Sequence, residues 1–403
     1  MPSPFPLRRI LTPVAIARLV IGWGAVGALA AAGPLLAPPV AGPVLLIVLA
    51  VIIAVILLCS FGVVHEAESL ALRLGDPCGT LILTLSIVTI EVVLIAAVML
   101  GPGDHTTIAR DSVMAVSMII LNLIVGVCLL LGGIRHGDLR ANRTGALAYT
   151  TLLEVLCTTA FALPAAIGTA GSYSSVQALT VAVMTVGLYG FFLWRQTGAQ
   201  AADFQEVAAP AGTDIGASTG QQTASTGKQT ASIGQQTASI EQRPAIGAVI
   251  TAHRSELLAR TALLIVTVLP IVLLSHDLAA LLDDSLGRLG APVELAGVLI
   301  AMIVFTPESI TAVRAALGGQ TQRVVNLCHG ALVSTVGLTI PTVLAIGLLT
   351  GQQVVLAESA ANLLLLGITL ALTAVAATSP RVTAMHGAAH LMVFGLYALV
   401  LFS

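Results

Sequence analysis

The hydrophobic positions of this chain fall into long apolar runs that are separated by short segments richer in polar residues. A helix needs about 20 apolar residues to cross roughly 30 Å of hydrocarbon, and eleven runs reach that length. The pattern therefore predicts an all-α polytopic membrane protein with about eleven transmembrane helices. The predicted spans are residues 14–32, 41–64, 79–100, 110–132, 145–168, 175–195, 256–276, 291–317, 323–349, 354–378 and 384–402.

A polar segment, residues 196–255, separates the sixth predicted span from the seventh and carries a seven-residue repeat, first complete at 218–224. Because the segment is poor in large apolar side chains, it cannot bury enough apolar area to fold alone. We predict a disordered cytoplasmic linker, which is either a flexible spacer or a regulatory tether. The predicted units are an amino-terminal transmembrane helix (1–38), a first five-helix repeat (39–195), the linker (196–255) and a second five-helix repeat (256–403).

The two halves of the chain are predicted to be inverted relative to each other. Each half contributes five spans after the first helix, and an odd number of crossings reverses the direction of insertion. Inverted repeats with an ion site near the midplane are a recurring plan of secondary transporters. One local match supports a repeat, since Thr89-Ile90-Glu91 and Thr306-Pro307-Glu308 both lie in the second span of their half.

Basic residues indicate which side of the membrane each loop occupies, because Lys and Arg favour cytoplasmic loops. Arg8, Arg9 and Arg18 flank the first span, so we predict a cytoplasmic amino terminus. Eleven crossings then leave the carboxyl terminus outside, and only Arg110 and Arg288 fall on the outer side.

Composition agrees with a location in the bilayer. The 403 residues are 57% hydrophobic and only 9% charged, whereas a soluble domain is about 25% charged. The formal net charge of −2, with no large basic cluster, excludes a nucleic-acid partner. The five cysteines lack metal-ligand spacing, and no phosphate-binding loop of the form G-x-x-x-x-G-K-S/T occurs. We therefore expect neither a cofactor nor an ATP-driven pump.

Two glutamates, Glu91 and Glu308, lie near the middle of predicted spans. An ionisable side chain at this depth costs at least ~2.5 kcal/mol on insertion scales, so it marks an ion pathway or a partner. The pair predicts a site for cations and protons; protonated packing residues are the alternative. Pro307 donates no hydrogen bond and frees the carbonyl of Ile303. That carbonyl is a candidate ligand, although a simple kink explains the proline equally well.

Neutral oxygens on these and the following spans are candidate secondary ligands, because calcium takes six to eight oxygen ligands. Thr84 shares a helix face with Glu91, and polar stripes run along the third span of each half. Packing between helices explains any one of these residues equally well. The candidate secondary ligands are Thr84, Asn122, Ile303, Asn326, Ser334 and Thr335.

The sequence leaves the roles of other polar residues open. His386 and His390 share a helix face but lack the further Cys or His of a transition-metal site. The acidic residues before the third span are expected to be solvated. The residues with open roles are Glu154, His329, His386 and His390, and those expected to be solvated are Glu66, Glu68 and Asp76.

Two blocks carry the glutamates: residues 65–99, with LSIVTIEVVLI around Glu91, and residues 298–341, with AMIVFTPESIT around Glu308. They resemble the signature repeats of bacterial ChaA-type calcium/proton and sodium/proton antiporters, which belong to the cation/calcium exchanger superfamily. The final segment, 386–400, and the position of the linker extend the resemblance to most of the chain.

The resemblance implies an antiporter of the bacterial plasma membrane, the cell inner membrane, that exports Ca²⁺, or Na⁺ or K⁺, in exchange for protons. Glu91 and Glu308 would be its shared ion sites.

Many such antiporters have Gly-Asn before each glutamate, whereas this chain has Ile87-Val88 and Val304-Phe305. This departure leaves the cation open, as the sequence also leaves the oligomeric state. The expected partners are the bilayer and the transported ions. A cation channel and, less favoured, a membrane-embedded enzyme are the alternative functions.

Overall fold

The computed structural model describes residues 10–33, 42–74, 85, 88–93, 95–96, 99–100, 106–205, 246–290, 292 and 294–402. In this part of the chain the structure is helical, and the only β pairing is three isolated bridges. The elements are α1 (Pro13–Ala32), α2 (Gly42–Leu74), α4 (Ile108–Met118), η3 (Ile119–Ile124), α5 (Val125–His136), α6 (Arg143–Cys157), η4 (Thr158–Ala162), α7 (Leu163–Ile167), α8 (Ser175–Thr197), η5 (Ala201–Phe204), α10 (Ile246–Leu289), α11 (Glu294–Leu317), α12 (Thr321–Thr350), α13 (Ala360–Thr378) and α14 (Ala384–Leu401).

The described residues hold nine spans that are long and apolar enough to cross a membrane, or ten when the bent α11 is counted as one span. These ten correspond to ten of the eleven predicted spans. Half of the remaining one, residues 79–100, lies outside the described residues, and 88–93 are helical. The prediction of an all-α polytopic membrane fold is confirmed.

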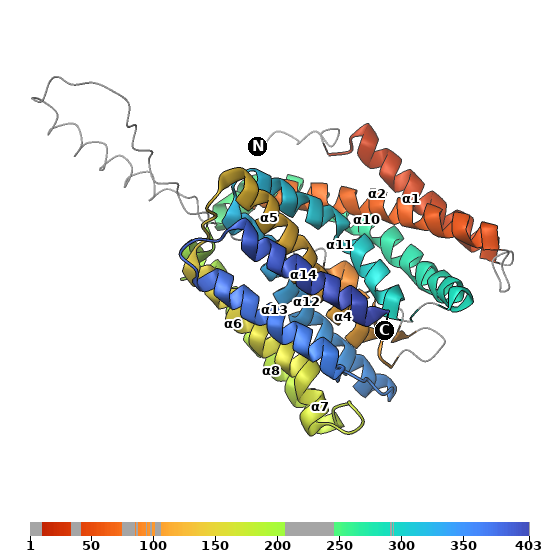
Figure 1. Ribbon diagram of the computed structural model, residues 1–403. Helices are drawn as coiled ribbons and strands as arrows, with labels where there is room; N and C mark the ends of the chain where they lie inside the picture. The colour runs from red at the N-terminus through yellow and green to blue at the C-terminus, as the bar shows by residue number, and fades with distance from the viewer. Residues whose placement is uncertain are drawn as a thin grey trace, which may run out of the picture.

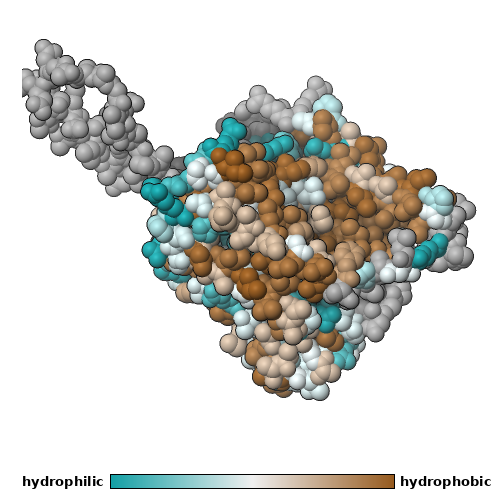
Figure 2. Space-filling model, viewed as in Figure 1, coloured by the Kyte–Doolittle hydropathy of each residue, from teal (hydrophilic) through white to brown (hydrophobic). Residues whose placement is uncertain are grey.

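Helices from both halves of the sequence pack against one another (Figure 1). α2 lies along α10, and α1 covers this pair. α12 is the most enclosed long helix of the second half; it contacts α4, α6, α8 and α11. Apolar side chains cover much of the surface seen in Figure 2, and exposed residues such as Ile47, Val183 and Leu364 contribute to the outer surface. An apolar outer surface of this kind is suited to contact with lipid.

Two long helices contain a π-helical turn. η3 joins α4 to α5, and η4 joins α6 to α7. A π turn inserts one extra residue into the helix and often occurs at a functional site. Asn122 lies in η3 and is fully buried. Local capping defines several helix starts, as when the side chain of Asn142 accepts hydrogen bonds from the amides of Thr144 and Gly145 at α6.

The helix ends gather on two opposite faces. We call one the linker face; it carries loops 137–142, 198–205, 318–320 and 379–383. The bridge between Leu139 and Val382 and the 2.7 Å hydrogen bond from the Asn142 amide to Gln322 Oε1 join these loops. The opposite face, which we call the far face, carries loops 168–174 and 351–359 and the carboxyl end of α14. These loops pair through hydrogen bonds from the Leu356 and Ala357 amides to the carbonyl of Gly171, each 3.0 Å.

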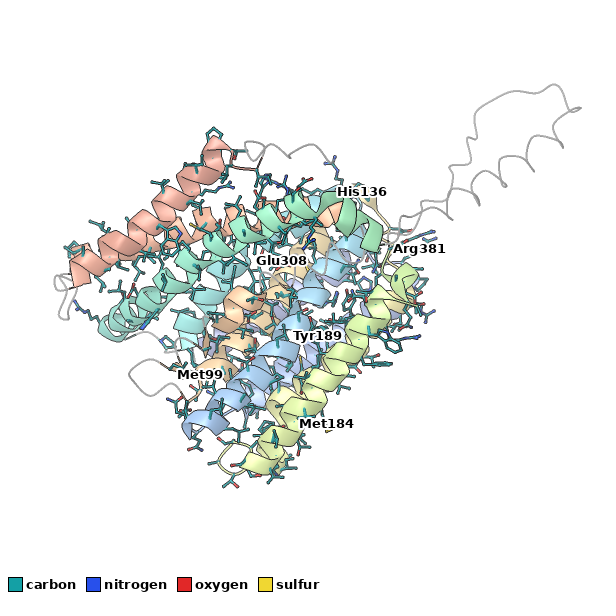
Figure 3. All side chains as sticks on the ribbon, turned by 180° about the vertical axis from the view of Figure 1, so that it is seen from behind. Met99, His136, Met184, Tyr189, Glu308 and Arg381 are labelled. Atoms are coloured by element: carbon teal, nitrogen blue, oxygen red, sulfur yellow. The ribbon has the colours of Figure 1, made fainter. Side chains whose placement is uncertain are left out.

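Most of the described arginines lie near the linker face. Figure 3 shows His136 and Arg381 at one end of the bundle and Met99 and Met184 toward the other. Arg110 lies in the first turn of α4, which is at the far face. The amide of Val355, from the far-face loop 351–359, donates a hydrogen bond to the carbonyl of Thr106 just before this helix. The arginines in or beside the loops of the linker face are Arg135, Arg140, Arg143, Arg195, Arg314, Arg323 and Arg381.

The structure narrows the segment that was predicted to be a disordered linker. α8 continues to Thr197, Ala201–Phe204 form a short 3₁₀ helix, and α10 begins at Ile246. Phe204 is only 2% exposed because its ring packs edge-on against Tyr149 and Phe192. The seven-residue repeats lie outside the described residues.

Glu66 is buried rather than solvated, which corrects the expectation from sequence. Its Oε2 atom lies 2.7 Å from Nη1 of Arg260, and Nε of Arg260 lies 3.3 Å from Oε1 of Glu256. The first pair joins α2 to α10 where the two helices pack, and the second lies within α10. The sequence missed the first pair because Arg260 lies 194 positions away from Glu66. Glu68 is half-buried, and Asp76 lies outside the described residues.

Candidate functional site

The two predicted site glutamates both lie inside the helix bundle. Glu91 belongs to the helical stretch 88–93, and Glu308 lies in the middle of α11; each is 4% exposed. The two carboxyl groups are near enough for the charge of Glu91 to act on Glu308. Figure 3 shows Glu308 between the two ends of the bundle, at an intermediate depth. The structure therefore brings together two acidic groups from the two halves of the chain.

The carboxylate oxygens of this pair are poorly satisfied by the protein. Thr335 Oγ1, from α12, donates a 2.6 Å hydrogen bond to Glu91 Oε2. Among the described residues, Glu91 Oε1 and both Oε atoms of Glu308 have no hydrogen-bond partner. A buried charge without a partner is costly. A proton or a bound cation would remove that cost, so the arrangement is suited to accepting either one.

α11 bends beside Glu308. The segments Gly297–Ile303 and Phe305–Leu317 meet at 54°, and Pro307 lies inside the helix just after the break. Proline removes the hydrogen bond that would reach the carbonyl four residues earlier, which is that of Ile303. The bend lies where an unpaired carbonyl was predicted, and a ligand role for that carbonyl stays a prediction.

Three of the predicted secondary ligands are hydrogen-bonded to groups other than the glutamates. Asn122 donates through Nδ2 to Thr369 Oγ1 over 2.8 Å, and its Oδ1 lies 3.2 Å from His390 Nδ1. Ser334 accepts from the Tyr189 hydroxyl, and Asn326 donates to the Phe204 carbonyl. These residues belong to polar contacts between helices.

Of the predicted secondary ligands, Thr335 is the one whose recorded hydrogen bond reaches a glutamate. Thr84 lies outside the described residues. Two residues near the predicted site residues were not identified from the sequence. Thr369 accepts the hydrogen bond from Asn122. The thiol of Cys328 is close enough to interact electrostatically with the Glu308 carboxyl group. A single threonine or cysteine in an apolar span gives no periodic signal, so only the packing of the helices identifies them.

The remaining polar residues fall into different environments. His329 is buried and stacks on Tyr149 at 6.3 Å between ring centroids. His386 is at the start of α14, where its Nδ1 accepts from the Thr383 amide over 3.2 Å. Glu154 is on the exposed surface of α6. Within the described residues, no group of three or more His, Cys, Asp or Glu could hold a metal ion.

Known proteins resemble this chain in sequence and in architecture. The family described as sodium/calcium exchanger protein matches residues 44–198 and 260–403. The sodium-potassium/proton antiporter ChaA of Escherichia coli is 30% identical over 347 residues, which cover 86% of each chain.

Solved structures extend the comparison to the fold. Native YfkE, called a Ca²⁺/H⁺ antiporter, has a TM-score of 0.65 at 15% identity and covers 96% of this chain and 99% of its own. The H⁺/Ca²⁺ exchanger CAX has a TM-score of 0.59 at 14% identity and covers 96% and 87%, respectively. The relatives are ion transporters rather than enzymes. Because the family match spans both halves, and the resemblance found in the sequence agrees with it, the chain belongs to the sodium/calcium exchanger protein family.

Proposed function

We propose that this protein is a secondary antiporter that exports Ca²⁺, or Na⁺ or K⁺, from the cytoplasm in exchange for protons. Glu91 and Glu308 would form the site that cations and protons occupy in turn. The observation that carries the proposal is the buried carboxylate pair whose Oε atoms, apart from Glu91 Oε2, lack a hydrogen-bond partner among the described residues. Membership of an ion-exchanger family supports it.

Charge balance explains why one site could exchange the two kinds of ion. One divalent cation neutralises two carboxylates, and two protons do the same. Either occupant leaves the buried pair near zero net charge and avoids the cost of an uncompensated charge in a medium of low dielectric constant. The empty, doubly ionised pair is the costly state, so the site would tend to change sides only when occupied.

The choice of cation depends on how many oxygens surround it. Four carboxylate oxygens, the Thr335 hydroxyl and the Ile303 carbonyl would together reach the lower limit of the six to eight ligands that calcium takes. A relative is named for sodium and potassium, and a structural neighbour for calcium. We propose Ca²⁺ first because two negative charges match its charge.

Purified protein in liposomes with a preset pH gradient provides the test of exchange. Addition of Ca²⁺, Na⁺ or K⁺ on one side should dissipate the gradient, as a pH-sensitive dye reports, and the rate should saturate with cation concentration. Mg²⁺ should be a poor substrate because it keeps its water shell. Cation flux that neither saturates nor moves protons would indicate a channel and refute the antiporter.

The linker face is proposed to be cytoplasmic, with the amino terminus on the same side and the carboxyl terminus outside. Gln320 and Gln352 flank α12 at opposite faces, and both are exposed. In intact cells, a cysteine at Gln352 should react with an impermeant maleimide, whereas one at Gln320 should react only after lysis. Cys78 would first be replaced by serine, because the other native cysteines are buried. The reverse labelling pattern would contradict the orientation.

A further inference from the structure

A cavity of about 430 Å³ opens at the far face, away from the loops of the linker face. It lies between the beginning of α4, Pro292 two residues before α11, the end of the 351–359 loop and the carboxyl end of α14. Its wall is charged on one side and apolar on the other. The lining residues used below are Arg110, Asp111, Pro292, Glu358 and Asn362.

The charged wall carries more negative than positive charge. Arg110 lies between two carboxylates: its Nε atom is 2.8 Å from Asp111 Oδ1 and 3.8 Å from Glu358 Oε1. Its Nη1 atom also donates a 3.2 Å hydrogen bond to the Ala357 carbonyl. No other Asp, Glu, Lys or Arg is among the residues that line the cavity. With both acids ionised, the wall has a net charge of −1.

Two oxygens of this wall are poorly satisfied: Glu358 Oε1 has only the 3.8 Å ion pair to Arg110, and Asn362 Oδ1 has no hydrogen-bond partner among the described residues. The side chain of Glu358 is 4% exposed, and its Oε2 atom accepts from the Ser359 amide at 2.9 Å and from Asn362 Nδ2 at 3.0 Å. Within the described part of the chain, no recorded hydrogen bond reaches Glu358 Oε1. Asn362 Oδ1 is buried without a hydrogen-bond partner there. Burial raises the pKa of Glu358, an effect that its hydrogen bonds and Arg110 oppose.

The cavity lies at the far-face end of the helices that contain the central site. Pro292 of its lining precedes α11, and α4 and α11 pack closely because Gly297 faces Ser112. Glu308 follows eleven residues after Gly297 on α11, which is ~16 Å at 1.5 Å per residue. A cation in the cavity would therefore be separated from the carboxylate pair by part of one helix.

We propose that this cavity is a second, peripheral cation site, distinct from the Glu91 and Glu308 pair, at which Glu358 and Asp111 hold a partly hydrated metal cation. The Oε1 atom of Glu358 and the Oδ1 atom of Asn362 supply oxygen ligands. The Arg110 side chain, which already pairs with Asp111 and Glu358, competes with the cation for these two carboxylates. A concave wall of one net sign raises the local concentration of the opposite ion. The proposal rests on the proposed transport function for its role, which is to hold cations at the far face, where the exporter releases them and where reverse exchange would load them, but not for binding itself.

Equilibrium binding separates this site from the central one. In a Glu91→Gln/Glu308→Gln double variant, calorimetric titration with Ca²⁺ at low ionic strength should reveal residual weak binding. Adding Asp111→Asn or Glu358→Gln should remove it, and adding Arg110→Gln should strengthen it by ~threefold to tenfold, because the competing charge is gone. Glu154→Gln, on the exposed surface of α6, is the matched control and should change nothing.

Transport kinetics give the second measurement, with the central glutamates intact. With exchange run in reverse, so that Ca²⁺ is supplied at the far face, Asp111→Asn should raise the apparent KM for Ca²⁺ by ~threefold to tenfold at low ionic strength and leave kcat unchanged. Arg110→Gln should lower the KM. Two results would overturn the peripheral site: no residual Ca²⁺ binding in the double variant, or a lower kcat with unchanged KM in Asp111→Asn, since the latter indicates a structural role. Residual binding in a protein that exchanges no cation for protons would instead refute the proposed function alone.

Discussion

Replacing Glu308 with glutamine is expected to reduce cation-driven proton movement to the background of protein-free liposomes. Glutamine keeps nearly the same volume, but its amide neither binds nor releases a proton at this position. The remaining Glu91 would leave a divalent cation with one uncompensated positive charge in the middle of the bundle, which is a large energetic cost. Glu91→Gln should have the same effect, because the proposed site is shared. Fluorescence of a pH-sensitive dye during cation addition is the measurement.

The control for this substitution is Glu154→Gln, which removes a carboxylate from the exposed surface of α6 and should exchange normally. Glu308→Asp should retain partial activity with a raised KM, since the carboxylate is withdrawn by one methylene. Size-exclusion profiles in detergent would show that each variant is folded. Exchange at the wild-type rate by folded Glu308→Gln or Glu91→Gln protein would refute the shared site.

A second large effect is expected where α5 crosses α14. Gly387 of α14 packs directly on α5, and a Cβ atom at this position would collide with the Leu130 amide nitrogen and lie 2.6 Å from the Gly126 carbonyl oxygen. Backbone atoms cannot turn aside as a flexible side chain can. Gly387→Ala should therefore push the helices apart and destabilise the protein by about 1–3 kcal/mol, the usual range for overpacking. The readout is a lower midpoint of thermal unfolding in detergent.

Gly395 provides the matched control on the same helix. A Cβ atom there would meet nothing within 4 Å, and alanine favours a helix over glycine by about 1 kcal/mol in soluble hosts. Gly395→Ala should leave the unfolding midpoint unchanged or raise it. Equal midpoints for the two alanine variants would show that the α5–α14 contact can relax without cost.

The sequence was most informative where a property repeats along one helix. Long apolar runs located the described spans, and an isolated acid at mid-span identified Glu91 and Glu308 without any knowledge of neighbours. Pro307 likewise indicated a break in α11 because the rule concerns only the carbonyl four residues earlier. These inferences need local chemistry alone, which explains why they could be made from one chain.

The sequence was least informative about partners on other helices. Asn122 lies on a polar stripe, but its bonds to Thr369 and His390 depend on which faces of α13 and α14 turn toward it. Glu66 was likewise predicted to be solvated, because its partner Arg260 lies on α10, a helix that is distant in the sequence. Helical periodicity shows which residues share a face but not which distant helix covers that face.

The burial of Phe204 has a consequence for how the gene can vary. The carbonyl of Phe204 accepts a hydrogen bond from Asn326, and its ring packs on Tyr149, so the end of the first half is fastened directly to a helix of the second. The tandem heptapeptide copies begin only after this fastening point. Replication slippage within these copies would add or delete whole heptapeptides in frame. The change in length would fall after Phe204 in the chain and would leave its contacts between the two halves unchanged. Natural populations should accordingly tolerate alleles of different repeat number, while substitutions of Phe204 itself should be rare.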